Sequence, residues 1–150
     1  MNHAFTARRP SPRNDTKALL RGLDANFNRA KEALRVLEDI SRFYLENRNL
    51  TAKLKRLRHG LTQILLKFPA SYRNWLEARD AAHDIGKDNP AQDSSRSDVR
   101  VLWISNMKRA QEALRVLEEF SKAVHGPRSS DFEKIRFSLY ELEKRSFQLF

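Results

Sequence analysis

The chain has 150 residues and a mass of 17.6 kDa, the size of one ordinary domain, and its 29 Lys and Arg outweigh 19 Asp and Glu to give a net charge of +10. The absence of cysteine excludes disulfides, thiolate metal sites and cysteine nucleophiles, and four glycines and five prolines are too few for an all-β fold. The glycines are also too scattered for a P-loop or a Rossmann phosphate loop.

The first 15 residues predict a flexible basic tail, because prolines and small polar residues interrupt any helical pattern there. The chain contains no run of eighteen apolar residues, and its N-terminal segment lacks the apolar core of a signal peptide. We therefore expect one all-helical domain over residues 16–150, located in the cytoplasm and not associated with a membrane.

An internal repeat dominates the rest of the chain. Residues 26–41 recur without a gap as residues 106–121, at an offset of 80, and eleven of the sixteen positions are identical. A weaker similarity relates residues 57–64 to residues 135–142, at an offset of 78. Each copy therefore predicts a pair of helices, with repeat one at about 23–68 and repeat two at about 99–149.

The first helix of each pair carries an apolar stripe at helical spacing. The stripes are Ala30, Ala33, Leu37, Ile40 and Tyr44 in the first copy, and Ala110, Ala113, Leu117, Phe120 and Val124 in the second. The second helix of pair one runs to Pro69, and that of pair two begins with a capping box formed by Ser130 and Glu133. Short connections at 46–49 and 125–129 make each pair an antiparallel hairpin.

These elements predict an all-α fold: a bundle of two internally duplicated helical hairpins related by a pseudo-twofold axis, with a long polar loop between them. Residues 71–79 could form a short extra helix, and residues 80–97 predict the loop. Loops of that length within compact domains are usually functional or disordered.

Polar residues recur every third position along the first helix of each pair, so they wind around it and cannot all face one ligand. Arg35 and Glu38 point away from the apolar stripe and predict ion pairs on a solvated face. Asn26 lies on the apolar face, as does Asn106, and is either a buried amide that bridges helices or a ligand-binding amide. Arg29 flanks that face, where a guanidinium suits phosphate binding.

The loop after residue 79 combines carboxylates with cations. Asp80 and Asp84, near Arg79 and Lys87, have the chemistry to hold Mg²⁺ against a phosphate chain, although polar loops also use Asp for turns. His83 has no partner at the spacing that a transition-metal site requires.

Four ordered motifs carry a family resemblance: Asp24-Ala25-Asn26-x-Asn28-Arg29-Ala30-x-Glu32, Leu57-Arg58-His59, Arg79-Asp80-x-x-x-Asp84-x-Gly86 and Asn106-x-x-Arg109-Ala110-Gln111-Glu112. From about residue 23 to residue 147, the chain resembles the stand-alone hydroxymethylpyrimidine-phosphate kinases of bacterial thiamine biosynthesis. All-helical domains of this kind are also often found fused N-terminal to thiamine-phosphate synthase. Because this chain ends at Phe150, we expect it to be the version that is separate from the synthase.

The resemblance implies transfer of the ATP γ-phosphoryl group to 4-amino-5-hydroxymethyl-2-methylpyrimidine phosphate, with Mg²⁺ as cofactor and thiamine-phosphate synthase as a possible partner. It implies phosphate clamps at Arg29, Arg79 and Arg109 and Mg²⁺ ligands at Asp80 and Asp84. The other candidate contacts to pyrimidine or nucleotide are Asp24, Asn26, Glu32, Arg58, Gly86, Asn106 and Glu112. A homodimer is compatible with the sequence.

Two other function classes stay open. The basic charge and tail favour an RNA-binding helical module, although the chain lacks the recognised RNA-binding modules, which disfavours nucleic acid. The other class is a non-catalytic or regulatory helical partner of thiamine-phosphate synthase.

Overall fold

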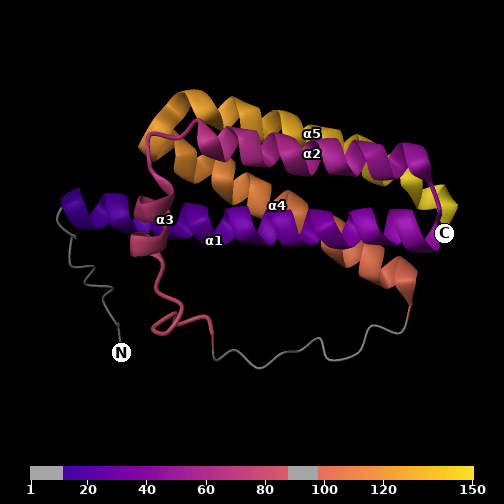
Figure 1. The fold of residues 1–150 in the computed structure, drawn as a ribbon, viewed down its shortest axis with the longest axis horizontal. Coiled ribbons are helices and arrows are strands. Elements are labelled where there is room, and N and C mark those ends of the chain that lie inside the picture. Colours follow the sequence, from indigo (N-terminus) through magenta and orange to yellow (C-terminus); the bar gives the residue numbers. More distant parts are fainter. Residues whose placement is uncertain (1–11, 88–97) are drawn as a thin grey trace, which may run out of the picture.

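The computed structural model of the chain describes residues 12–87 and 98–150, and within these ranges the elements are helices and turns without a strand (Figure 1). The long helices are α1 (Pro12–Asp39), α2 (Arg48–Leu66), α4 (Val99–His125) and α5 (Ser129–Ser146), and α3 (Tyr72–Ala78) is short. A π-helical turn (Ile40–Tyr44) extends α1, and 3₁₀ turns (Gly126–Arg128 and Phe147–Leu149) flank α5. The prediction of an all-α fold is confirmed.

The helices form two layers. Helices α1 and α4 run in opposite directions, cross each other and share the largest interface, while α2 and α5 lie next to each other on one side of that pair (Figure 1). Helix α2 also packs on α1 and α5 on α4, so each long helix contacts its hairpin partner. None of the helices among the described residues is long and apolar enough to cross a membrane.

The first helix begins earlier than the sequence predicts. It starts at Pro12, within the segment expected to be a tail, because proline is well tolerated at the first position of a helix, where its missing N–H has no helical partner. Residues 1–11 of the expected tail and residues 88–97 of the expected loop lie outside the described residues. The short helix expected at 71–79 is confirmed as α3, and residues 80–87 form turns.

The predicted capping box of α5 is wrong. The chain enters α5 from a 3₁₀ turn, Arg128 occupies the cap position without a side-chain hydrogen bond, and the Ser130 hydroxyl instead lies 3.5 Å from the carbonyl oxygen of Pro127. The preceding turn replaces the cap, because the backbone N–H of Ser129 donates to the Gly126 carbonyl. A capping box does exist at α3, between Ser71 and Asn74, where the sequence analysis did not expect one.

The apolar stripes form the core, with three deviations. The stripe residues through Ile40 are buried in the first copy, and Ala110, Ala113 and Leu117 are buried in the second. Tyr44 is exposed; it is the last residue of the π-helical turn, whose wider spacing moves it away from the stripe. Phe120 and Val124 are only partly buried and pack at the edge of the core.

Candidate functional site

A cavity of about 590 Å³ lies between α1 and α4, in the size range of small-molecule sites. We call it the main cavity. Its lining consists of Asn26, Arg29, Glu32, Ala33 and Val36 from α1, and Asn106, Arg109, Glu112, Ala113 and Val116 from α4. These ten residues form five pairs of identical type, and each pair is separated by 80 positions. The two copies of the sequence repeat therefore contribute the same set of side chains to one cavity.

Helical spacing explains why these residues meet. Positions 26, 29, 33 and 36 follow the i, i+3, i+7, i+10 pattern of one helix face, and position 32 flanks it. The small side chains of Ala33 and Ala113 leave room between the helices, and Val36 and Val116 provide apolar surface. These four residues are not among the site residues predicted from the sequence, although their identity in both copies is a signal.

The two asparagines are held in the same way. The Asn26 amide nitrogen Nδ2 donates to the carbonyl oxygen of Gly22 at 2.8 Å, and that of Asn106 donates to Leu102 at 2.8 Å. Both residues are more than nine-tenths buried. Each amide is thus anchored to the preceding turn of its own helix and also lines the main cavity. A structural role and a ligand-binding role for Asn26 are therefore compatible.

The charged residues of the main cavity balance one another. Arg29 and Arg109 carry guanidinium groups, Glu32 and Glu112 carry carboxylates, and all four residues are exposed. The cavity therefore offers donors for an anionic ligand beside acceptors for a polar or cationic one.

A second cavity of about 330 Å³ contains Arg79 and Asp80, together with Lys17, Arg21 and neighbouring residues. Asp24 binds Arg79 in a bidentate ion pair, with 2.7 Å from Nε to Oδ2 and 2.8 Å from Nη2 to Oδ1. The hydrogen bond and charge of Asp24 raise the pKa of Arg79. The Arg21 guanidinium donates to the backbone carbonyl of Asp80 at 2.8 Å. The predicted site residues Asp24, Arg79 and Asp80 are thus brought together, but outside the lining of the main cavity.

The loop carboxylates are engaged in local hydrogen bonds. Oδ1 of Asp80 accepts from the backbone N–H of His83 at 3.2 Å and lies 2.9 Å from Nδ1 of the same residue, and these contacts lower the pKa of Asp80. Oδ1 of Asp84 accepts from the backbone N–H of Gly86 at 2.9 Å. Within residues 12–87 and 98–150, no group of three or more His, Cys, Asp or Glu side chains is placed to hold a metal ion.

The prediction that Glu38 lies on a solvated face is wrong. Glu38 is buried and accepts hydrogen bonds from Arg58 of α2, at 2.8 Å from Nε and 3.4 Å from Nη2, while Arg35 of its own helix lies 3.6 Å away and remains exposed. The reason is that α2 covers this side of α1. Arg58, expected to bind substrate, is therefore engaged with Glu38 and does not line the main cavity.

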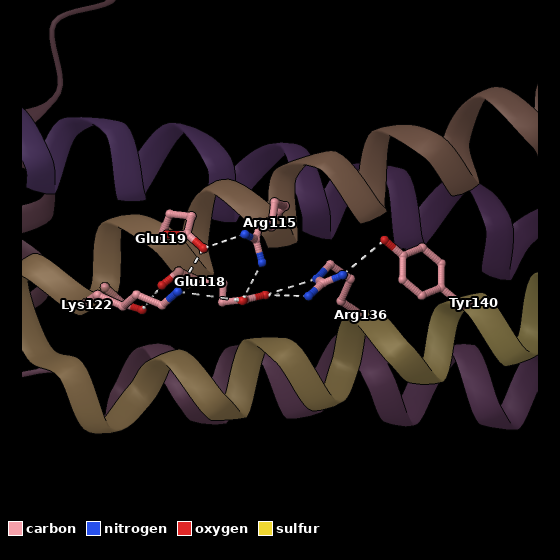
Figure 2. A network of polar contacts seen from close by, with 7 residues as sticks. Arg115, Glu118, Glu119, Lys122, Arg136 and Tyr140 are labelled. Atoms are coloured by element: carbon pink, nitrogen blue, oxygen red, sulfur yellow. Dashed lines mark hydrogen bonds and ion pairs between the residues drawn. The ribbon is translucent and has the colours of Figure 1, made fainter.

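The second copy contains the equivalent ion pair. Glu118 of α4 is buried and is held by Arg136 of α5, which also donates to the Tyr140 hydroxyl at 3.1 Å, and by Arg115 of its own helix at 2.7 Å (Figure 2). Burial opposes the charge of Arg136, but the hydrogen bonds with Tyr140 and Glu118 outweigh it and raise the pKa of Arg136. Glu38–Arg58 and Glu118–Arg136 occupy corresponding positions of the two copies and tie each hairpin together.

The fold and the main cavity together define an all-helical protein with a polar, ligand-sized cavity between the matching helices of two repeats. The model of the ThiD2 family matches residues 21–145, a range that includes both copies, and the chain belongs to this family.

Several similar proteins are thiamine-phosphate synthases. The chain is 41% identical over 127 residues to a thiamine-phosphate synthase of Synechocystis, covering 84% of this chain and 35% of that protein. It is 36% identical over 132 residues to a thiamine-phosphate synthase of Rhodopirellula baltica, covering 84% and 33%, and 36% identical over 128 residues to one of Nostoc, covering 85% and 35%. The chain thus spans about a third of the length of these relatives. No solved structure matches it.

Proposed function

We propose that this protein acts in thiamine biosynthesis and transfers the γ-phosphoryl group of ATP to 4-amino-5-hydroxymethyl-2-methylpyrimidine phosphate, forming the diphosphate. The observation that carries the proposal is the main cavity, in which Arg29 and Arg109 lie with two amides and two carboxylates. Membership of the ThiD2 family and the names of the relatives support the pathway.

The chemistry demands little covalent participation from the protein. A phosphate oxygen of the acceptor forms a bond to the γ-phosphorus, the bond from that phosphorus to the β–γ bridging oxygen breaks, and ADP leaves with its electron pair. The attacking oxygen is already anionic, so no strong base is needed, and catalysis consists of positioning and charge stabilisation. Guanidinium groups supply both, because they bind phosphate oxygens through two parallel N–H donors.

Each candidate residue has a role within this proposal. Arg29 and Arg109 clamp phosphates in the main cavity, and the amides of Asn26 and Asn106, which also line it, contact the ligand. Arg79, held by Asp24, remains a candidate phosphate clamp at the second cavity, where its exposed edge carries further N–H donors. Arg58 acts indirectly through its ion pair with Glu38, and Gly86 acts through its hydrogen bond with Asp84 in the loop.

Mg²⁺ is commonly held by one or two protein carboxylates together with substrate phosphates, and two pairs of residues fit that pattern. In Asp80 and in Asp84, Oδ1 accepts a hydrogen bond from a backbone N–H of the loop, and Oδ2 is the oxygen that could bind the ion. Glu32 and Glu112 share the main cavity with the arginines. When bound, Mg²⁺ would offset the negative charge of the phosphate chain.

The test is ADP formation by the purified protein with Mg-ATP and either the pyrimidine monophosphate or the free hydroxymethylpyrimidine. We expect turnover with the monophosphate only, and a loss of about 100-fold or more in kcat/KM for Arg29→Ala and Arg109→Ala, as for other electrostatic stabilisers of a transition state. Absence of turnover with both acceptors, in protein shown to be folded, would overturn the proposal.

A second candidate function is that of a helical partner or domain of thiamine-phosphate synthase without its own catalysis. The observation in its favour is that relatives bearing that name contain a matching region as about a third of their length. A protein without kinase activity that co-sediments with thiamine-phosphate synthase would support this alternative.

A further inference from the structure

We infer that the main cavity consists of two equivalent half-sites, each of which binds the phosphoryl end of a different ligand. The α1 half-site contains Asn26, Arg29 and Glu32, and the α4 half-site contains Asn106, Arg109 and Glu112. This inference rests on the proposed function, because it assigns one half-site to the nucleotide and the other to the pyrimidine monophosphate.

The course of the helices places the half-sites at opposite ends of the cavity. Helices α1 and α4 run antiparallel (Figure 1), and Gly22 near the start of α1 faces the ring of Phe120 near the end of α4. Asn26 therefore lies toward one end of the cavity and Asn106 toward the other. Asn26 and Val36 are ten positions apart and thus about 15 Å apart along the helix, enough length for two phosphoryl groups in succession.

The asparagines of the two half-sites match in conformation as well as in residue type. Both amides donate from Nδ2 to the carbonyl four residues earlier, and both distances are 2.8 Å. Each half-site therefore combines an amide that is fixed in the same way with one arginine and one glutamate. An approximate two-fold axis through the crossing of α1 and α4 would produce this arrangement.

The helices that carry the half-sites have different neighbours on the side away from the main cavity. Lys108 and Gln111, outside the lining of the cavity, both contact Glu143 of α5, at 2.9 Å and 2.7 Å. The corresponding positions on α1 are Asn28 and Lys31, and residue 65, the counterpart of Glu143, is leucine. Because the lining itself is the same in both copies, the assignment of the nucleotide and of the monophosphate to the half-sites is made by binding measurements.

Two facing phosphoryl groups are the arrangement that transfer between ATP and a phosphate acceptor requires. Such groups repel each other, and one guanidinium for each group offsets that repulsion.

The experiment compares Arg29→Ala with Arg109→Ala by calorimetric titration with two probes, the β,γ-imido analogue of ATP and the pyrimidine monophosphate. We expect one variant to weaken the nucleotide analogue by about tenfold or more while it leaves the monophosphate nearly unchanged, and the other variant to do the reverse. Arg35→Ala is the matched control, because Arg35 lies on α1 outside the main cavity. Weakening of the same probe by both variants would overturn the inference.

Inorganic phosphate provides a readout that does not depend on catalysis. Equilibrium dialysis is done in the Arg79→Ala background, which removes the candidate clamp of the second cavity. It should count two phosphates for each chain in that background and one after the further change Arg29→Ala or Arg109→Ala. If two phosphates bind and no ADP forms, the proposed kinase activity fails and the two half-sites stand. If ADP forms but only one phosphate binds, the half-sites fail and the activity stands. If neither is observed, both fail.

Discussion

Arg136 binds one oxygen of Glu118 through two nitrogen atoms, with 3.0 Å from Nε to Oε2 and 2.8 Å from Nη2 to the same oxygen (Figure 2). Both side chains are about nine-tenths buried, so this ion pair between α4 and α5 is largely removed from water. An ion pair in such surroundings contributes little relative to apolar residues of the same shape, but loss of one partner is costly.

Replacement of Arg136 by methionine should therefore lower the free energy of unfolding by about 3 kcal/mol, because the charge of Glu118 stays buried without its main partner. Urea unfolding followed by circular dichroism measures this value. The double variant Arg136→Met/Glu118→Gln should recover at least half of the loss. If the double variant is as unstable as the sum of the single variants, the two residues are not coupled.

Gly22 permits a close approach of α1 and α4. A Cβ atom at this position would overlap the ring of Phe120, with Cδ2 at 2.9 Å, whereas at Gly60 in α2 the nearest such atom is Cδ1 of Ile135 at 3.9 Å. Gly22→Ala should destabilise the protein by about 1 to 2 kcal/mol through overpacking. Gly60→Ala, the matched control, should stabilise it by up to about 1 kcal/mol through helix propensity. Equal shifts in thermal midpoint for both variants would contradict the role of Gly22.

The ion pair of Asp24 and Arg79 distinguishes two roles for that arginine. If Arg79 binds a phosphate, Asp24→Asn should leave the positive charge of Arg79 in place. This variant should then reduce kcat/KM much less than Arg79→Ala does. If Arg79 only holds α3 and the following loop against α1, the two variants should be equally impaired. We expect the first result, with a difference of about tenfold or more, because Arg79 is 43% exposed and keeps donors beyond those bound to Asp24. Steady-state kinetics on both variants gives the answer.

The two candidate carboxylate pairs predict different Mg²⁺ requirements. We expect Glu32→Gln to raise the Mg²⁺ concentration needed for half-maximal ADP formation by about tenfold, because Glu32 shares the main cavity with Arg29 and Arg109, the proposed phosphate clamps. Asp84→Asn tests the loop pair, since the exposed carboxylate of Asp84 accepts a hydrogen bond from the backbone N–H of Gly86. A larger change for Asp84→Asn would place the ion at the loop instead.

Asp80 should titrate at lower pH than an ordinary aspartate, because hydrogen bonds from His83 stabilise its ionised form. A lowered pKa in the folded state means that this group stabilises the fold above its unfolded pKa and loses that contribution as the pH falls through its folded pKa. Carbon-detected NMR titration measures the midpoint directly. In His83→Ala the pKa of Asp80 should rise toward its ordinary value, and an unchanged midpoint would show that the contact does not persist in solution.

Much of the main cavity could be predicted from the sequence. The repeat at an offset of 80 identified Asn26, Arg29 and Glu32 with their counterparts, and helical periodicity placed Asn26 on the apolar face. All six of these residues line the main cavity. Local spacing suffices for such residues because a helix fixes which side chains share a face, whatever packs against it.

Other features depended on packing between distant segments. Glu38 appeared to lie on a solvated face, since nothing in the spacing of α1 shows that α2 covers that side and brings Arg58 within 2.8 Å. The sequence motif also grouped Arg79 with the other phosphate clamps, but its ion pair with Asp24, 55 residues away, holds it at the second cavity. The sequence by itself determined the helices, their apolar faces and the matched polar set, because these follow from local periodicity. Only the tertiary structure decided which polar residues are buried and which share a cavity, because burial depends on the element that packs against each face.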